Sequence, residues 1–225
     1  MAGRITAIKI QKKDRERASI FIDGQFAFGL ALVEAARLRT GQHLSDEDIA
    51  ALQTVDEQAR AYEFALDFLS YRPRSQAEVA RRLRDKEFLE PTIEYVLQRL
   101  SRAGLIDDVE FARYWIGNRE QFKPRGMRAL RYELREKGIA NDIVEELLQD
   151  LDQTDSAHRA AAPKIRRWRQ LDPLEFRRKL AGFLQRRGFT YNVIAEVWER
   201  IQTDGEATLP DNDEREDQEV WDQEV

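Results

Sequence analysis

The chain has 225 residues, of which 42% are hydrophobic, and it contains two histidines and no cysteine. This is enough apolar material for one or two folded domains, and the lack of cysteine excludes disulfides, thiolate catalysis and cysteine-based metal sites. No stretch approaches the roughly 18 consecutive apolar residues of a membrane span. The N-terminus carries no charged-then-apolar leader, so we expect a cytoplasmic protein with no membrane contact.

The net charge of −5 is unevenly distributed along the chain. Residues 204–225 hold ten acidic residues against Arg215 alone, a net charge of −9, whereas residues 1–203 carry 36 basic and 32 acidic residues, a net charge of +4. A weakly basic body points to a polyanionic partner, or to a partner bound to a polyanion. The tail combines low hydrophobicity with dense like charge, so we expect it to be disordered.

The first 30 residues predict a strand followed by a hairpin. Residues 4–10 alternate apolar and polar side chains, as do the two short runs on either side of Asp23-Gly24. An Asp-Gly pair between two alternating runs is the strongest local signal for a hairpin turn, because both residues accept positive φ. Residues 11–17 are almost wholly charged and predict a solvated loop.

Two short helices are expected after this hairpin. The apolar run 30–38 predicts the first of them. Ser45 and Asp48 form a capping-box pattern for a second helix that extends through Leu52.

A period of about 50 residues dominates the rest of the folded part. Leu83, Leu134 and Leu184 hold the same place in three similar stretches, 51 and then 50 residues apart, and the apolar positions and helix ends around them coincide. Apolar residues at i, i+3, i+4 and i+7 predict three helices in each repeat. Repeats of this size share a core with their neighbours, so we expect an elongated modular array.

Start and stop signals place the helices of the first repeat. Its first helix begins near Asp56, and Ser75 and Glu78 form a capping box for the second. The third runs over residues 90–103 and ends at Gly104, a glycine suited to a left-handed cap.

The later repeats have comparable signals. Gly138 ends the second helix of repeat two. Repeat three begins near Asp155, and its second helix starts with Asp172 as the N-cap and ends at Gly188.

We therefore predict a mainly α protein with a β-hairpin and short helices at 1–55, three-helix repeats at 56–104, 105–153 and 154–203, and an acidic tail at 204–225.

No group of residues predicts catalysis. Asp107 and Asp108 are adjacent carboxylates, but they lie where a helix needs an N-cap and their side chains point apart, which favours capping over metal binding. His43 and His158 are isolated among polar residues, which favours solvent exposure. There is no glycine-rich phosphate loop, nucleophile elbow or zinc spacing, so we expect no enzyme activity, cofactor or metal.

Basic residues gather in the third repeat. Ten lie between Arg159 and Arg187 against only Asp172 and Glu175, with Trp168 among them. This pattern is typical of phosphate contact, with Trp168 available for base stacking. The alternatives are a solvated face for the arginines and a core position for Trp168, and for Trp168 the core position is favoured.

Three combined motifs resemble the RecX family of recombination regulators. They are FLSYRPRSQAEV at 68–79 with Leu83, GLIDDVEFA at 104–112, and KPRG at 123–126 followed by ELREKGI at 133–139. These motifs cover residues of roughly 60–150, and the remaining parts match the family in layout more than in residues. Glu87 departs from the family, where a Lys-Gly pair commonly ends this helix, and suggests a different C-cap.

The resemblance implies a non-enzymatic monomer that binds the RecA–DNA filament in its groove and restrains strand exchange, ATP hydrolysis and coprotease activity. It implies contact with single- or double-stranded DNA weakly or through the filament. Together with the basic cluster it suggests thirteen filament- or DNA-binding candidates: Arg72, Arg74, Lys123, Arg125, Lys164, Arg166, Arg167, Arg169, Arg177, Arg178, Lys179, Arg186 and Arg187.

Two other functions remain open on the residues alone. Short three-helix units resemble helix-turn-helix domains, which makes a DNA-binding regulator one alternative. A helical-repeat scaffold that binds only protein is the other. The acidic tail is expected to compete with DNA or the filament for the basic residues, so deleting residues 204–225 should tighten DNA or filament binding at low salt.

Overall fold

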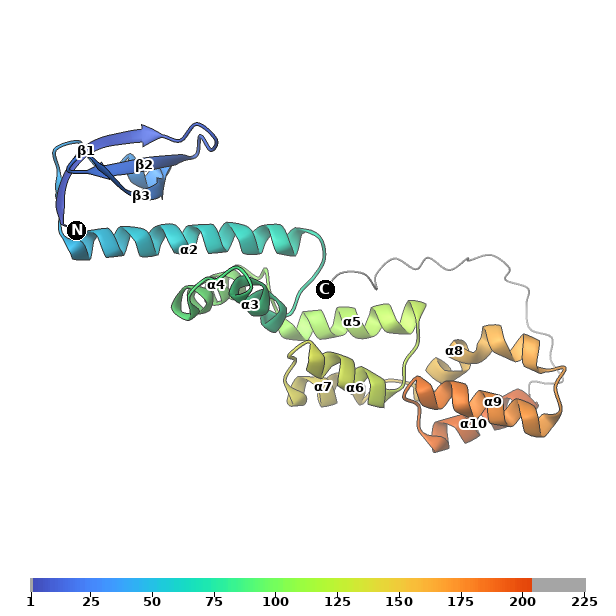
Figure 1. The fold of residues 1–225 in the computed structure, drawn as a ribbon. Helices are drawn as coiled ribbons and strands as arrows, with labels where there is room; N and C mark the ends of the chain where they lie inside the picture. Colours follow the sequence, from blue (N-terminus) through green and yellow to red (C-terminus); the bar gives the residue numbers. More distant parts are fainter. Residues whose placement is uncertain (1, 204–225) are drawn as a thin grey trace. The chain divides into compact units, whose positions relative to one another are not determined.

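The structure is a computed structural model that describes residues 2–203, and the acidic tail with its expected disorder lies outside this range. The described residues form ten helices and four strands (Figure 1), which confirms a mainly α protein with a small N-terminal β element. They divide into two compact units. The first comprises the chain up to Arg119 together with Arg131–Asp150, and the second comprises Glu120–Leu130 and the chain from Leu151 onward.

An antiparallel sheet with the strand order β3-β2-β1-β4 opens the first unit. Its strands are β1 (Gly3–Ile10), β2 (Arg17–Ile22), β3 (Gln25–Ala31) and β4 (His43–Leu44). Asp23 and Gly24 have φ angles of 48° and 84°, so the predicted hairpin turn is confirmed. β4 pairs with the start of β1 and is too short to leave an alternating pattern in the sequence.

One face of the sheet carries the core of this N-terminal part. Ile5, Ile20 and Leu30 are fully buried there and pack with side chains of α1 and α2. Helix α1 (Leu32–Ala35) is shorter than the predicted helix at 30–38, because β3 continues through Ala31.

Helix α2 (Asp46–Ser70) is continuous over 25 residues. The two separate helices expected here, one through Leu52 and one from about Asp56, are therefore wrong as separate elements. No glycine or proline interrupts the helix, and Asp56 is an interior residue. Its carboxylate accepts hydrogen bonds from Arg17 Nη2 at 2.7 Å and from the Ala31 N–H at 3.0 Å, which ties α2 to the sheet.

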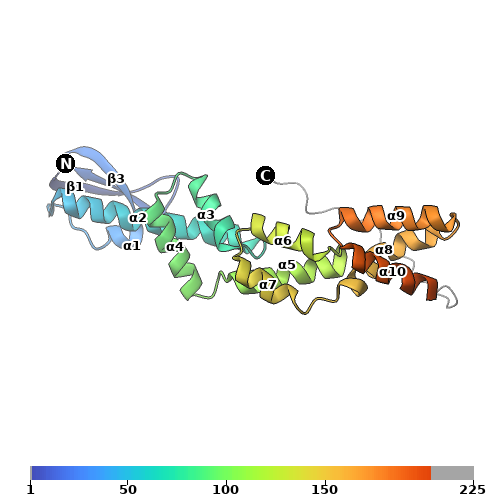
Figure 2. The same ribbon diagram turned by 90° about the horizontal axis from the view of Figure 1, so that it is seen from below.

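The C-terminal half of α2 forms the first three-helix repeat together with α3 (Gln76–Arg84) and α4 (Glu90–Arg102). Figures 1 and 2 show both helices beside this half of α2. The predicted capping box is confirmed, since the Ser75 Oγ accepts from the Glu78 N–H and the Glu78 carboxylate accepts from the Ser75 N–H. Gly104, at φ 66°, ends α4 as expected.

The second and third repeats have three helices each. They are α5 (Asp108–Phe122), α6 (Met127–Glu136), α7 (Asn141–Leu148), α8 (Gln153–Trp168), α9 (Pro173–Arg186) and α10 (Tyr191–Thr203). Asp107 caps α5 by accepting from the N–H groups of Val109 and Glu110. Helix α8 begins slightly before the expected Asp155, because Asp152 is its N-cap.

The repeat anchors are confirmed by burial. Leu83, Leu134 and Leu184 are each 0% exposed. Each is followed four residues later by a residue with a left-handed backbone, and the first of these is Glu87, at φ 62°. The expectation of a different C-cap at Glu87 is therefore wrong: the Phe88 N–H bonds to the Leu83 carbonyl in the pattern that also ends α6 and α9.

Candidate functional site

The basic residues of the third repeat face away from its core because of helical periodicity. In α8 the buried positions Ala157, Ala161 and Ile165 recur every four residues and pack against α9 and α10. Arg166 and Arg167, which follow Ile165, lie off this buried stripe and are exposed. The half-buried Trp168 packs against the core, which confirms the core reading of that residue.

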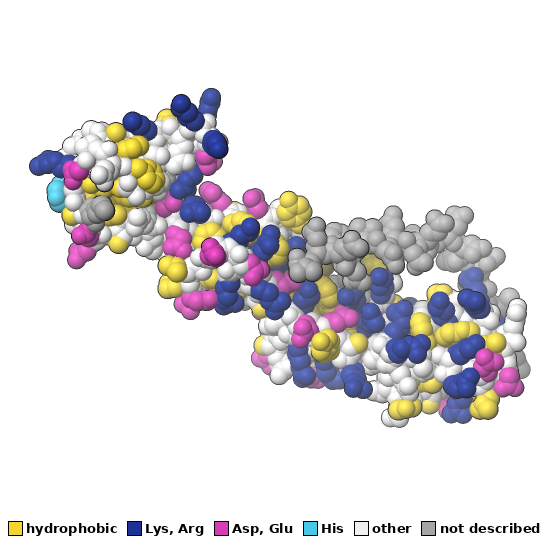
Figure 3. Space-filling view, viewed as in Figure 1, with side chains coloured by type: hydrophobic (Ala, Val, Ile, Leu, Met, Phe, Trp, Pro, Cys, Tyr) yellow, Lys and Arg dark blue, Asp and Glu magenta, His cyan; other side chains and the backbone are white. Residues whose placement is uncertain are grey.

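Helix α9 repeats this division. Phe176, Leu180 and Leu184 are buried, whereas Arg177 and Arg178 are exposed. The helix begins as predicted, with the Asp172 carboxylate accepting from the N–H groups at the second and third helical positions and Pro173 at the first. Figure 3 shows Lys and Arg side chains gathered over α8 and α9 on the face viewed.

Seven of the thirteen candidates form what we call the basic surface. All are exposed, and within residues 2–203 none makes an ion pair or a side-chain hydrogen bond. Because these side chains are exposed and have no internal partner, an external anion can bind them without first breaking an ion pair within the protein. The seven are Lys164, Arg166, Arg167, Arg169, Arg177, Arg178 and Arg186.

Four other candidates of the second unit border this set. Lys179 is paired with Glu175 at 3.0 Å. Lys123 is exposed, whereas Arg125 and Arg187 are half-buried. Arg187 lies over the Phe183 ring at 4.6 Å, donates to the Pro124 carbonyl at 3.4 Å, and has a pKa lowered by burial and by the nearby charge of Arg125. The fold thus brings the 123–126 loop to the end of α9.

Arg72 and Arg74 lie in the first unit and have internal contacts. The Arg74 guanidinium lies 4.0 Å from the centre of the Phe68 ring, and burial lowers its pKa. Arg72 forms two hydrogen bonds with the Glu78 carboxylate, at 2.8 and 3.2 Å, and donates to the Pro73 carbonyl. Both arginines therefore have partners within the protein, unlike the seven residues of the basic surface.

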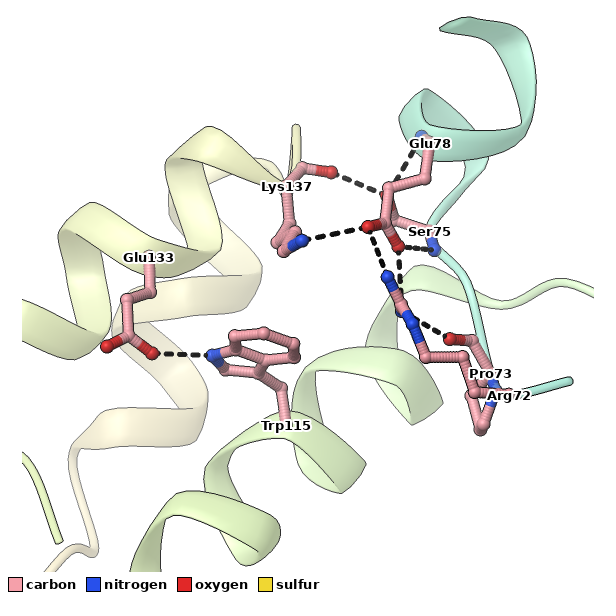
Figure 4. A network of polar contacts seen from close by, with 7 residues as sticks. All are labelled: Arg72, Pro73, Ser75, Glu78, Trp115, Glu133 and Lys137. Atoms are coloured by element: carbon pink, nitrogen blue, oxygen red, sulfur yellow. Dashed lines mark hydrogen bonds and ion pairs between the residues drawn. The ribbon is translucent and has the colours of Figure 1, made fainter. Parts of the chain in front are cut away.

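The Glu78 carboxylate joins the first two repeats (Figure 4). It accepts from Lys137 Nζ at 2.8 Å as well as from Arg72, and Ser75 Oγ donates to the Lys137 carbonyl at 2.6 Å. Burial by itself raises the pKa of Glu78, but the hydrogen bonds and charges of Arg72 and Lys137 outweigh it and lower the pKa from 4.5 to about 2. This junction leaves no local pattern in the sequence, because Lys137 is 59 residues away from Glu78.

Two further groups of the junction surround Trp115. Its indole Nε1–H donates to the Glu133 carboxylate at 2.8 Å, and Arg119 donates to the same carboxylate at 2.8 Å. The cations of Arg119 and Lys137 lie 4.6 and 5.0 Å from the centre of the Trp115 ring. The Lys137 ammonium group thus contacts the Trp115 ring as well as the Glu78 carboxylate.

The carboxylates that resemble a metal site have local roles. Asp107 caps α5, and Asp108 Oδ1 accepts from the Gln76 N–H at the start of α3, 2.8 Å away. Burial, reinforced by the charge of Asp107, raises the pKa of Asp108. No group of three or more potential metal ligands occurs in the part of the chain that the structure describes, and no helix there has the length and apolar character needed to cross a membrane.

Fold and surface together define a class: a helical-repeat protein with a small β element, three tandem three-helix domains and a cationic surface on the third. Models of four RecX domains match the chain in the same order. They are the N-terminal domain of the regulatory protein RecX at residues 3–45 and the first, second and third three-helix domains at 61–100, 107–148 and 151–198.

Relatives extend this match over most of the chain. The regulatory protein RecX of Bacillus subtilis (strain 168) is 35% identical over 203 residues, which is 88% of this chain and 77% of the relative. The regulatory protein RecX of Mycobacterium sp. (strain KMS) is 37% identical over 149 residues, 63% of this chain and 80% of the relative. The chain belongs to the RecX family of regulatory proteins.

Solved structures agree on the fold. A crystal structure of a regulatory protein RecX matches with a TM-score of 0.68 at 29% identity, covering 88% of this chain and 100% of that one. The crystal structure of RecX from Lactobacillus salivarius matches with a TM-score of 0.61 at 23% identity, covering 66% of this chain and 99% of that one.

Proposed function

We propose that this protein regulates homologous recombination by binding the RecA–DNA filament in its groove and restraining strand exchange, ATP hydrolysis and coprotease activity. It has no catalytic activity of its own in this proposal and acts as a monomer in the cytoplasm. Membership of a family of regulatory proteins supports a regulatory role. The observation that carries the proposed mode of binding is the basic surface on α8 and α9.

The basic surface suits a polyanion for a physical reason. Its seven cations are exposed and unpaired within residues 2–203, so each phosphate contact releases condensed counterions without first breaking an internal ion pair. Members lie on two helices that pack against one another within the second unit. Because each cluster spans a wide arc of its helix, only some members face one partner at a time.

The test replaces Arg166, Arg167, Arg177 and Arg178 by Ala. We expect weaker filament binding and a salt dependence that is less steep by up to about one unit for every phosphate that is no longer bound. Restraint of strand exchange and of ATP hydrolysis should weaken in parallel. Thermal stability should change little, because exposed arginines without partners contribute little to folding.

A matched control removes the same charge from the first unit. Arg60, Arg81, Lys86 and Arg102 are exposed, and replacing these four by Ala lowers the net charge equally. We expect this variant to bind with nearly wild-type affinity and salt slope. If the α8 and α9 variant also kept both values, the basic surface would be only a solvated face, and contacts would have to be sought at Arg72, Arg74, Lys123 and Arg125.

The same assay separates this proposal from the two alternatives. Affinity is measured for naked DNA, for RecA alone and for the filament, each at several salt concentrations. A filament regulator binds the filament tightest, a DNA-binding regulator binds naked DNA equally well, and a protein-only scaffold binds RecA alone with little salt dependence. Incubation of the purified protein with nucleotide, Mg²⁺ and DNA should give no turnover.

A further inference from the structure

The N-terminal sheet has a second face that its core does not use. Because side chains alternate along a strand, Ile20 and Ile22 of β2 point into the core while Ser19 and Phe21 point the other way. Register places Phe21 beside Phe26 of β3. Neither phenylalanine packs against the buried cluster of this region.

The two rings form an ordered aromatic platform. Phe26 is 61% exposed, and its ring meets Phe21 edge-on, with centroids 6.0 Å apart and an interplanar angle of 79°. Lys9 Nζ lies 4.9 Å from the centre of the Phe21 ring. The Phe21 ring is therefore held between a cation and its neighbour, which leaves Phe26 as the ring available to a ligand.

The rest of this face is small, polar and cationic. Lys9, Ser19 and Gly29 pair across the three strands in the next row, about 7 Å from the phenylalanines. Gln11 donates to Ser19 Oγ at 3.3 Å. Figure 3 shows Lys and Arg side chains gathered at the end of this sheet where the loop between β1 and β2 lies. The loop that joins β1 to β2 carries three exposed cations: Lys12, Lys13 and Arg15.

Charge favours an anionic ligand on this face. Residues 1–45 contain eight basic and four acidic residues, a net charge of +4. Arg17 is held by Asp56 at 2.7 Å, but Lys12, Lys13 and Arg15 make no ion pair within residues 2–203. Asp14 and Glu16 share the loop, and the Asp14 carboxylate is engaged with the Glu16 N–H.

We propose that this sheet face binds single-stranded nucleic acid, with an unpaired base stacked on Phe26 and the backbone phosphates along Lys9 and the loop that joins β1 to β2. Stacking on exposed sheet aromatics next to cations is a general mode of binding unpaired strands, tolerant of sequence because every base has a π-face. The site lies in the first unit and goes beyond the proposed function, since it requires neither RecA nor the basic surface. A purely apolar protein partner would not need the cations, whereas unpaired bases on a phosphate backbone use both features.

The experiment uses the full chain with Ala at Arg166, Arg167, Arg177 and Arg178, so that the basic surface does not contribute. A fluorescently labelled oligothymidylate without RecA is the probe. Phe26→Ala should weaken its binding roughly tenfold, and Phe26→Leu nearly as much, because stacking requires a ring rather than apolar area. Phe26→Trp should bind at least as tightly as Phe26, and its added indole fluorescence should be quenched by the oligonucleotide.

The control is Val33→Ala, which removes an apolar side chain that is 72% exposed on α1. It should leave binding unchanged. Replacing Lys12 and Lys13 by Ala should reduce the salt slope by up to about 0.7 for every phosphate that is no longer bound. Wild-type affinity in Phe26→Leu, or an unquenched Phe26→Trp, would overturn the proposal, while failure of the α8 and α9 variant alone would leave it standing.

Discussion

The ends of α3 and α6 share one backbone geometry but use different residues. Glu87 after α3 and Gly138 after α6 have φ angles of 62° and 77°. In each, the next N–H returns to the carbonyl of the buried anchor: Phe88 to Leu83 at 3.3 Å and Ile139 to Leu134 at 3.0 Å. Backbone conformation alone therefore does not decide where glycine is required.

Packing explains the difference between the two ends. A Cβ on Gly138 would lie 2.3 Å from the Ala77 Cβ, and one on Gly188 would lie 2.6 Å from the Ala129 Cβ and backbone nitrogen. Both glycines are thus pressed against the first turn of a helix in the preceding repeat. The first repeat has no three-helix repeat before it to pack against the end of α3. Glu87 therefore only has to adopt a positive φ, and no preceding repeat lies against its side chain.

The two contacts are reinforced by the same backbone group. In each junction the carbonyl of the residue before the glycine accepts a hydrogen bond from the start of a helix in the preceding repeat. At the first junction Ser75 Oγ donates to the Lys137 carbonyl, and at the second the Gly126 N–H donates to the Arg187 carbonyl. The first junction adds the Glu78 carboxylate, whereas the repeat alignment places Ala129 at the position of Glu78. The second junction therefore lacks a carboxylate at this position, and its ion pair is instead the one between Arg159 of α8 and Glu120 of α5.

The largest effect is expected for Gly138→Ala. An alanine here would have to adopt a positive φ, and its Cβ would clash with Ala77. Together these two effects should lower the free energy of unfolding, measured in urea, by about 2 to 4 kcal/mol. Gly104→Ala is the matched control, because Gly104 also has a positive φ, of 66°, but open space around it. That variant should cost only about 1 kcal/mol. Equal destabilisation in the two variants would mean that the Ala77 contact contributes nothing.

The second prediction concerns pH and the Glu78 ion pairs. Because the folded-state pKa of Glu78 is about 2 against 4.5 unfolded, its contribution is fully present above about pH 5 and is lost as pH falls toward 2. By linkage this contribution is up to about 3 kcal/mol. Glu78→Gln should therefore be less stable than wild type at pH 7, with the gap closing at low pH. The measurement is the unfolding free energy from pH 7 to pH 2.5.

The second junction supplies the control for this prediction. Gly126 bonds to the Arg187 carbonyl without a carboxylate at the Glu78 position, so changes there should not produce the same pH dependence. Gly188→Ala should lower stability by a similar amount at pH 7 and pH 3. A gap between wild type and Glu78→Gln that stayed constant over the whole pH range would contradict the assigned pKa.

Local signals explain what could be predicted from the sequence. Asp23-Gly24, the Ser75 and Glu78 capping box and the Asp172 N-cap each act within a few residues, so their patterns are readable without the fold. The anchor leucines were predictable because the repeat supplied three copies of one pattern.

Long-range contacts explain what the sequence did not reveal. Asp56 resembles a helix start, yet it is buried inside α2 because Arg17 and Ala31 of the sheet bond to it. The same holds at the candidate site: periodicity identifies exposed cations such as Arg178, but only the fold separates them from Arg72, whose partner lies across a turn. Whether a cation is paired is a property of the folded neighbourhood.

The smallest effect is expected where the first helix end departs from glycine. A non-glycine residue in the left-handed region is strained by roughly 1 kcal/mol, so Glu87→Gly should stabilise the native backbone. Glycine also increases the entropy of the unfolded chain, which offsets part of this gain. We therefore expect a net stabilisation of about 0.5 kcal/mol, measured as a rise in urea midpoint at constant slope. Glu87→Ala removes the carboxylate while keeping the Cβ, and it should give no gain. A gain in both variants would assign the effect to the charge of Glu87 rather than to its backbone conformation.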